Sequence, residues 1–206
     1  SGLGGGSSDA ASVIRGICSL YSLNPAKDEL IEIAASIGSD VPFFLSGGQA
    51  VASGRGEKLR SILLPLNYQI LVISPRKAIS TAEVYKKMRI NLTKRNHSIL
   101  LLSNIDESTF VGALGSFKND LEDAAVGIAP ELDVVKKMLN AIGADFYSMT
   151  GSGSSFYALS FDENKFNVLS CRDTRSRVST NNGIDGLRSL GHRIYFTRPI
   201  TLPPLI

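Results

Sequence analysis

Hydrophobic residues recur along the first part of the chain at the spacing of amphipathic helices. Residues 9–23 carry apolar side chains at mixed three- and four-residue intervals, which predicts a helix that is buried over more than half of its circumference. Asn24 and Pro25 interrupt that pattern. Residues 28–37 then predict a second helix that ends at Gly38.

Short apolar runs alternate with further helical patterns in the rest of the chain. Strands are expected at residues 49–53, 68–73, 145–149, 156–161 and 193–197. Helices are expected at residues 81–88, 108–114, 120–126 and 130–142, and a helical turn near residues 99–102. This mixture predicts an α+β fold. Because the apolar strand at 68–73 is expected to open a second unit, we assign two domains, residues 1–65 and 66–206.

Composition places the chain among folded globular proteins and narrows its partners. Of 206 residues, 43% are hydrophobic and 20% charged, with a formal net charge of +3. The densest basic stretches, residues 86–95 and 172–177, are interrupted and indicate solvated faces, so no nucleic-acid partner is expected. There is no run of 18 apolar residues and no signal segment, which predicts no membrane span and a cytoplasmic location.

Cysteine and histidine usage disfavours a metal site built from side chains. The two cysteines, Cys18 and Cys171, form no CxxC motif, which excludes a disulfide-rich scaffold and a recognisable zinc motif. The two histidines, His97 and His192, are far apart in sequence. We therefore expect no metal ligands among the side chains.

A glycine- and serine-rich segment precedes the first predicted helix. Glycine lets a ligand approach the main chain, and the first N–H groups of a helix, together with its dipole, favour an anion. The segment lacks the Gly-Lys-Ser/Thr of a Walker A loop and is no Gly-x-Gly-x-x-Gly motif after a strand. It predicts phosphate binding, and the alternative is a flexible linker. The candidate residues are Gly2, Leu3, Gly4, Gly5, Gly6, Ser7 and Ser8.

Two further segments carry candidate chemistry. Asp40 lies in the turn of residues 38–44, where its carboxylate is either a catalytic base or an ordinary helix cap. A second Gly/Ser loop, residues 150–155, lies between two predicted strands. It is either a hairpin turn or a loop whose small residues permit close approach to another segment.

These segments together resemble the GHMP superfamily of small-molecule kinases. The run from Gly2 to Ala11 is similar to the second signature motif, residues 38–44 to a Gly-Ala/Ser-Asp-Val-Pro segment, and residues 149–156 to the third motif. The resemblance spans residues 2–161 and is weak beyond. It implies a GHMP kinase fold, with a truncated N-terminal domain of the ribosomal protein S5 domain 2 type and a C-terminal α/β sandwich.

The resemblance also implies residue roles. ATP, with Mg2+, would be bound by the first loop, and Asp40 would be the catalytic base. Gly151, Ser152 and Gly153 would close the substrate site. Thr81 and Tyr85 have the spacing of a threonine and an aromatic residue that stacks on a cytosine in this family, although Tyr85 can equally be a partly buried helix residue. Residues 119–122 are interpreted as structural, with Asn119 or Asp120 as alternative organisers of the site.

The implied function is phosphorylation of the 2-hydroxyl of 4-diphosphocytidyl-2-C-methylerythritol in non-mevalonate isoprenoid synthesis. The expected partners are small molecules, ATP and this alcohol, and the protein is expected to be a monomer or homodimer. The family has an upstream portion with a lysine that assists phosphoryl transfer, and the chain begins without it, so we expect little activity from this chain alone. The alternatives are another GHMP kinase, for homoserine, mevalonate or a sugar, and a non-catalytic nucleotide-binding fragment.

Overall fold

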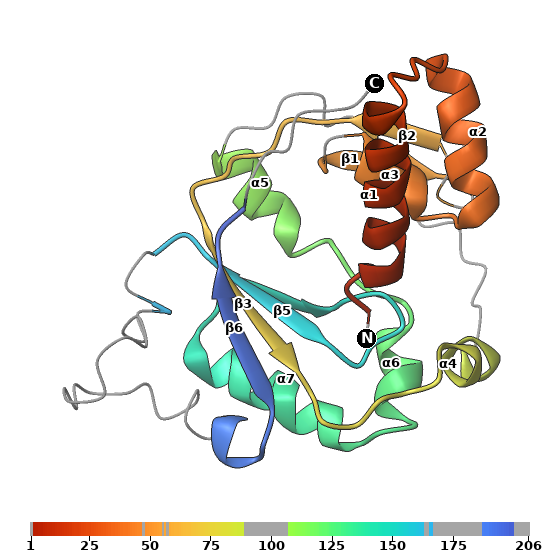
Figure 1. Cartoon of the computed structure of the whole chain (residues 1–206). Coiled ribbons are helices and arrows are strands. Elements are labelled where there is room, and N and C mark those ends of the chain that lie inside the picture. The colour runs from red at the N-terminus through yellow and green to blue at the C-terminus, as the bar shows by residue number, and fades with distance from the viewer. Residues whose placement is uncertain are drawn as a thin grey trace, which may run out of the picture. The chain divides into compact units, whose positions relative to one another are not determined.

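The computed structural model describes residues 2–46, 48–54, 56, 58–88, 107–162, 165–166 and 187–199 (Figure 1). The chain divides into two compact units. The N-terminal unit contains the described residues from 4 to 65. The sheet unit contains residues 2–3, 66–88, 108–162, 165–166 and 187–199.

The N-terminal unit is built from three helices and a two-stranded hairpin. The helices are α1 (Gly5–Leu20), α2 (Lys27–Ile37) and α3 (Val41–Leu45), and the antiparallel strands are β1 (Ala50–Ser53) and β2 (Lys58–Ser61). Each helix contributes two buried residues to one small core: Ala11, Ile14, Leu30, Ala34, Val41 and Leu45. Arg15 of α1 donates hydrogen bonds to the carbonyls of Phe44 and Leu45, at 3.0 and 3.3 Å, and so satisfies the C-terminal end of α3.

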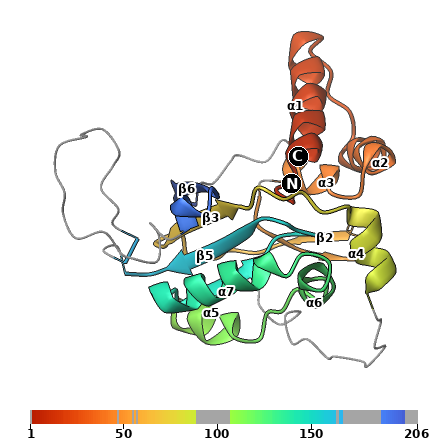
Figure 2. The same cartoon turned by 90° about the horizontal axis from the view of Figure 1, so that it is seen from below.

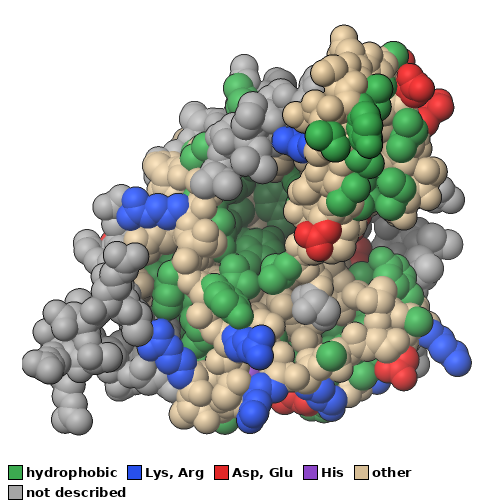
Figure 3. Space-filling view, viewed as in Figure 1, with side chains coloured by type: hydrophobic (Ala, Val, Ile, Leu, Met, Phe, Trp, Pro, Cys, Tyr) green, Lys and Arg blue, Asp and Glu red, His purple; other side chains and the backbone are tan. Residues whose placement is uncertain are grey.

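Helix α1 differs from its sequence prediction in two respects. It begins at Gly5 rather than at residue 9, so four residues of the expected loop form its first turn. The expectation of burial over more than half its circumference is wrong, because only Ala11 and Ile14 are buried. Several apolar side chains of α1 are exposed, and green atoms lie over this helix in Figure 3. The reason is that α1 packs in its unit mainly against α3 and α2, which cover one side of it.

The sheet unit is organised around an antiparallel sheet with the strand order β4-β5-β3-β6. Its strands are β3 (Gln69–Ser74), β4 (Phe146–Met149), β5 (Phe156–Ser160) and β6 (Arg193–Thr197). In the register, Ile73 lies opposite both Phe156 and Ile194. Because side chains alternate along a strand, Leu71 and Ile73 of β3 face the same side as Phe156 of β5.

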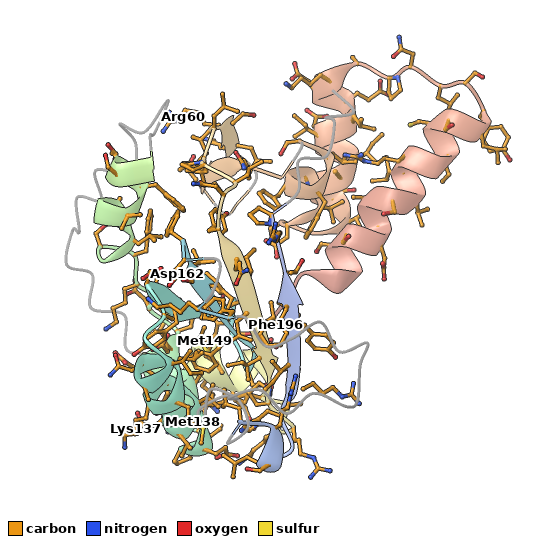
Figure 4. The ribbon with its side chains drawn as sticks, turned by 90° about the vertical axis from the view of Figure 1, so that its left-hand side faces the viewer. Arg60, Lys137, Met138, Met149, Asp162 and Phe196 are labelled. Carbon is orange, nitrogen blue, oxygen red and sulfur yellow. The ribbon has the colours of Figure 1, made fainter. Side chains whose placement is uncertain are left out.

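That side of the sheet is covered by helices. The helices of this unit are α4 (Thr81–Lys87), α5 (Glu107–Leu114), α6 (Glu122–Val126) and α7 (Glu131–Ile142). Figures 1 and 2 show α6 and α7 on one face of the sheet. Helix α7 buries Leu132, Val135, Leu139 and Ile142, which recur at three- and four-residue intervals. Met149 of β4 is buried in the same core and lies between the sheet and α7 in Figure 4.

The other predicted elements of the chain are confirmed within a few residues. The predicted strands correspond to β1, β3, β4, β5 and β6, and the predicted helices to α2, α4, α5, α6 and α7. The predicted turn at residues 99–102 lies outside the described residues. In the part of the chain that the structure describes, no helix is long and apolar enough to cross a membrane.

Asp145, just before β4, is hydrogen-bonded to the last residue of β5 and to the residue that follows it. Its carboxylate accepts hydrogen bonds from Ser160 Oγ at 3.0 Å and from the Phe161 N–H at 2.9 Å, and pairs with Lys165 Nζ at 3.0 Å. Burial raises the pKa of the Asp145 carboxyl, but the hydrogen bonds from Phe161, Lys165 and Ser160 outweigh burial and lower the pKa overall.

Because the pKa of Asp145 is lowered by folding, its carboxylate stabilises the fold above the unfolded-state pKa, and this contribution is lost as the pH falls through the folded-state value. Asp145→Asn should lower the free energy of unfolding at neutral pH by about 1 kcal/mol, the scale of one net hydrogen bond, because Asn keeps one oxygen acceptor. The difference from wild type should shrink below about pH 4. Urea unfolding of both proteins, at neutral pH and below about pH 4, measures this difference in the free energy of unfolding.

The matched control is Asp133→Asn, which removes an exposed ion pair with Lys137 on α7. Exposed pairs contribute little, so this variant should stay close to wild type. An equal loss in both variants, or a pH-independent loss in Asp145→Asn, would contradict the role given to Asp145.

Candidate functional site

The first Gly/Ser segment forms the N-terminal end of a long helix. Gly4 is the N-cap of the 16-residue helix α1, with φ of 66°, and its carbonyl accepts the Ser8 N–H at 2.9 Å. The first turn, Gly5 to Ser8, contains no acidic residue. The N–H groups that begin a helix have no partner within it, and the helix dipole adds positive potential there. This end of α1 can therefore bind an anion.

Gly4 is packed against α3. A Cβ built at Gly4 would lie 2.8 Å from the ring of Phe44, and the positive φ also disfavours a side chain. Phe44 belongs to the short helix that follows Asp40. The turn that carries Asp40 and the start of α1 are thus held together within one unit, through α3.

Asp40 lies in the N-cap position of α3, but its side chain accepts no capping hydrogen bond. The residue is exposed, whereas the two that follow it, Val41 and Pro42, are buried. Burial of Val41 and the fixed φ of Pro42 give the turn a stiff base. The carboxylate is therefore accessible on a rigid turn, and the alternative of a hydrogen-bonding helix cap is not what the structure shows.

The second Gly/Ser loop, residues 150–155, joins the antiparallel strands β4 and β5. The Thr150 N–H donates to the Ser155 carbonyl at 2.9 Å, and the Gly153 N–H to the Thr150 carbonyl at 3.0 Å. Ser154 Oγ donates to the Lys77 carbonyl at 2.7 Å, which fastens the loop to the segment after β3. The loop is therefore a hairpin connection, and its small residues are also used for close packing.

Gly2 lies directly against this second loop. The Thr150 hydroxyl donates a hydrogen bond to the Gly2 carbonyl. A Cβ at Gly2 would lie 2.5 Å from the Thr150 carbonyl oxygen and 3.1 Å from that of Gly153, and φ at Gly2 is 83°. The two main chains can approach this closely only because Gly2 has no side chain.

Thr81 and Ser152 are brought together at another edge of the second loop. Thr81 Oγ1 lies 2.8 Å from Ser152 Oγ, a hydrogen bond in which either hydroxyl can donate. Helix α4 starts here, with Ser80 Oγ accepting the Glu83 N–H at 3.4 Å. Tyr85 is 59% exposed and lies four residues after Thr81, so both share one helix face. Its ring is free to stack on a flat ligand, and it is not a partly buried helix residue.

The candidate residues therefore form two groups, one in each unit. The first turn of α1 and Asp40 belong to the N-terminal unit. Gly2, Thr81, Tyr85 and the second loop belong to the sheet unit. Among the described residues, no three His, Cys, Asp or Glu side chains are grouped to hold a metal ion.

Sequence reasoning gave little weight to one residue and missed another. Asn119, interpreted chiefly as structural, donates hydrogen bonds to two carbonyls at the base of the second loop. Glu122 was not singled out, and it accepts the Met149 N–H. The Asn-Asp-Leu-Glu run was the available signal, but sequence alone does not show that it lies beside a strand 30 residues later.

Comparisons with known proteins connect these segments to one family. The GHMP kinases N terminal domain matches residues 1–48, and the GHMP kinases C terminal domain matches residues 101–170. A 4-diphosphocytidyl-2-C-methyl-D-erythritol kinase of Bacillus velezensis is 38% identical over 199 residues, which are 97% of this chain and 64% of the relative. The enzyme of the same name from Bacillus subtilis is 36% identical over the same shares. The chain thus spans about two thirds of the length of these relatives.

Solved structures give the same fold. A crystal structure of 4-(cytidine 5'-diphospho)-2C-methyl-D-erythritol kinase matches with a TM-score of 0.72 and 30% identity, over 96% of this chain and 66% of that one. Homoserine kinase from Cytophaga hutchinsonii matches with a TM-score of 0.67 over 98% of this chain and 66% of that one. At 18% identity, the second likeness shows the fold alone.

The contact between Gly2 and the second loop can be tested by adding one methyl group. Gly2→Ala should separate Gly2 from the loop, because the new Cβ meets the Thr150 carbonyl and the backbone conformation is strained. We expect at least tenfold faster hydrogen exchange of the amides of residues 150–155, which mass spectrometry measures. Gly16→Ala is the control, since Gly16 lies in α1 with no atom within 4 Å of an added Cβ. Unchanged exchange in Gly2→Ala would show that the contact does not hold the loop.

Proposed function

We propose that this chain, which belongs to the GHMP kinase family, carries the ATP-binding loop and much of the substrate site of a kinase that phosphorylates the 2-hydroxyl of 4-diphosphocytidyl-2-C-methyl-D-erythritol. The observation that carries the proposal is the 36–39% identity, across 97% of the chain, to Bacillus enzymes of that name. The geometry of both Gly/Ser segments, of Asp40 and of α4 supports it. The two-domain assignment, 1–65 and 66–206, and the cytoplasmic location remain predictions.

The first turn of α1 is proposed to bind the ATP phosphates. Its N–H groups and the dipole of a 16-residue helix offset negative charge, and Gly5 and Gly6 leave the main chain accessible. Mg2+ would enter with the nucleotide, held by the phosphates and by water rather than by ligands from the chain. When bound, that ion would offset charge on the transferring phosphoryl group.

Asp40 is proposed to accept the proton of the attacking hydroxyl. Phosphoryl transfer to an alcohol requires that the hydroxyl loses its proton as the new bond to phosphorus forms, and a carboxylate positioned beside it assists this step. The turn supports this role because it presents an exposed carboxylate, with no capping hydrogen bond, on the buried base of Val41 and Pro42.

Thr81, Tyr85 and the second loop are proposed to bind the cytidine part of the substrate. An exposed tyrosine ring offers a flat surface for a pyrimidine, and the Thr81–Ser152 hydrogen bond holds the start of α4 against the loop. Recognition of cytidine also distinguishes this proposal from a homoserine, mevalonate or sugar kinase, whose substrates have no base to stack.

Asp40→Asn should abolish most of the turnover, because the amide cannot accept the proton. In the protein as its source makes it, we expect kcat to fall about a hundredfold or more, the usual contribution of a general base. A coupled assay of ADP release measures the rate. Asp28→Asn, at an exposed first-turn position of α2, is the control. A near-normal kcat in Asp40→Asn would exclude Asp40 as the base.

Tyr85→Ala should weaken binding of cytidine diphosphate ligands about tenfold to a hundredfold, because stacking of one base on an aromatic ring contributes about 1–3 kcal/mol. Binding of a non-hydrolysable ATP analogue should not change, and Tyr85→Phe should retain affinity. Isothermal titration calorimetry measures both ligands. Tyr195→Ala removes a similarly exposed tyrosine from β6 and is the control. Unaltered cytidine affinity in Tyr85→Ala would refute the stacking role.

A further inference from the structure

Strand β4 is an edge strand, and its outer side is bonded by side chains instead of by another strand. Among the described residues, in the order β4-β5-β3-β6, β4 pairs only with β5. At Met149, the last residue of β4, the N–H donates to Glu122 Oε2 at 3.2 Å, and the carbonyl accepts from Asn119 Nδ2 at 2.8 Å. Both backbone groups that a further strand would use at this residue are thus satisfied by two side chains at the start of α6.

Asn119 bonds both the end of β4 and the second loop. The same Nδ2 group donates a second hydrogen bond, of 2.8 Å, to the carbonyl of Gly151. Its Oδ1 accepts the Leu121 N–H at 3.0 Å, which fixes the orientation of the amide. The two donated bonds connect the last residue of β4 to a residue inside the second loop, so they set the path of the main chain between them.

Glu122 is itself held by a charge on α7. Lys136 Nζ lies 2.6 Å from Glu122 Oε1, and the side chains of the two residues are only 26% and 14% exposed. The hydrogen bond with Glu122 raises the pKa of Lys136 despite the opposing effect of burial, so the ammonium stays protonated at neutral pH. The start of α6 is therefore anchored to the sheet and to α7, and it offers Asn119 a rigid base.

The segment that Asn119 holds is the one that contacts Gly2. The main chain of Gly151 lies against that of Gly2, since a Cβ at Gly151 would be 3.5 Å from the Gly2 carbonyl oxygen. Thr150, between the two carbonyls that Asn119 binds, donates its hydroxyl to the same Gly2 oxygen. A displacement of the second loop would therefore be transmitted to Gly2, the first described residue of the phosphate-binding segment.

We propose that Asn119 is a positioning residue for the nucleotide: by bonding the Met149 and Gly151 carbonyls it fixes the second loop, and through that loop it fixes Gly2 at the start of the phosphate-binding segment. The proposal rests on the proposed function in assigning ATP to that segment. Asn119 itself is proposed to touch neither ATP nor the alcohol substrate. Its amide is suited to the role because one NH2 group can donate to two carbonyls, which a carboxylate cannot do.

Asn119→Ala removes both donated hydrogen bonds. Asn119→Asp keeps the shape of the side chain, but it replaces the donating NH2 group by a carboxylate oxygen, which the Met149 and Gly151 carbonyl oxygens repel. We expect the dissociation constant of a non-hydrolysable ATP analogue to rise about tenfold in each variant, the equivalent of one to two net hydrogen bonds. Calorimetry well below the melting temperature measures it on the protein as its source makes it. Asn140→Ala and Asn140→Asp make the same changes at an exposed position of α7 and should bind normally.

A merely structural role would lower the melting temperature and leave this dissociation constant unchanged, and that result would overturn the proposal. If the charge in Asn119→Asp prevents folding, Asn119→Ala still decides, because it introduces no repulsion.

Hydrogen exchange without ligand separates this proposal from the proposed function. In Asn119→Ala the amides of residues 150–155 should exchange at least tenfold faster than in Asn140→Ala. If the unaltered protein binds no ATP, the proposed function fails, whereas accelerated exchange would still support the positioning of the loop by Asn119. Unchanged exchange would overturn the positioning role whether or not ATP binds.

A double-mutant cycle tests the route through Thr150. Thr150→Val removes the hydroxyl that bonds Gly2 while keeping the shape of the side chain. If Asn119 acts through this contact, Asn119→Ala should change ATP affinity less in the Thr150→Val background than in the unaltered protein. Independent, multiplicative effects of the two substitutions would contradict the route.

Discussion

The loop that joins β4 and β5 depends for its close approach to the N-terminal segment on a contact at Gly2, where main chain lies against main chain. An added Cβ at Gly2 would lie 2.5 Å from the Thr150 carbonyl oxygen, a distance that real Cβ atoms do not show. The Gly2 carbonyl also accepts a hydrogen bond from the Thr150 hydroxyl. The contact therefore fixes which residues of the two segments lie opposite each other. It joins residues separated by 148 positions in sequence.

Such a contact requires that the loop itself be rigid, and a Gly/Ser loop has little intrinsic rigidity. The structure supplies rigidity from outside the loop. Asn119 bonds the carbonyls of Met149, just before the loop, and of Gly151 within it. Ser154 donates to the Lys77 carbonyl, and Thr81 is hydrogen-bonded to Ser152. These bonds come from two segments, the one before α6 and the one that joins β3 to α4, so the loop is restrained at both of them. The small residues of the loop permit its close approach to Gly2. The hydrogen bonds from neighbouring segments restrict the main-chain flexibility that these small residues would otherwise give the loop.

The sequence predicted most elements, because their apolar periodicity is strong: β6 has the expected bounds, and α7 has the expected buried face. It failed at the start of α1, where glycine and serine disfavour a helix locally, yet Gly5 to Ser8 are helical because the long helix continues through them. It also misjudged the burial of α1, since hydrophobicity does not show which neighbours are present. For the site, motif resemblance identified the segments, but not the bonds of Asn119 and Glu122, which join residues about 30 positions apart.

The glycines of the first segment separate into two kinds, and the difference bears on function. Gly2 and Gly4 are required by the fold, because an added Cβ would overlap the Thr150 carbonyl in one case and the Phe44 ring in the other. Gly5 and Gly6 are not, since they are helical and nothing lies within 4 Å of an added Cβ. Glycine is less favourable than alanine in a helix, by about 1 kcal/mol in the helix interior. The fold alone gives no reason to retain that cost at two successive positions. A ligand that approaches the exposed N–H groups of the first turn does give one, because a methyl group there would stand between the phosphate and the main chain.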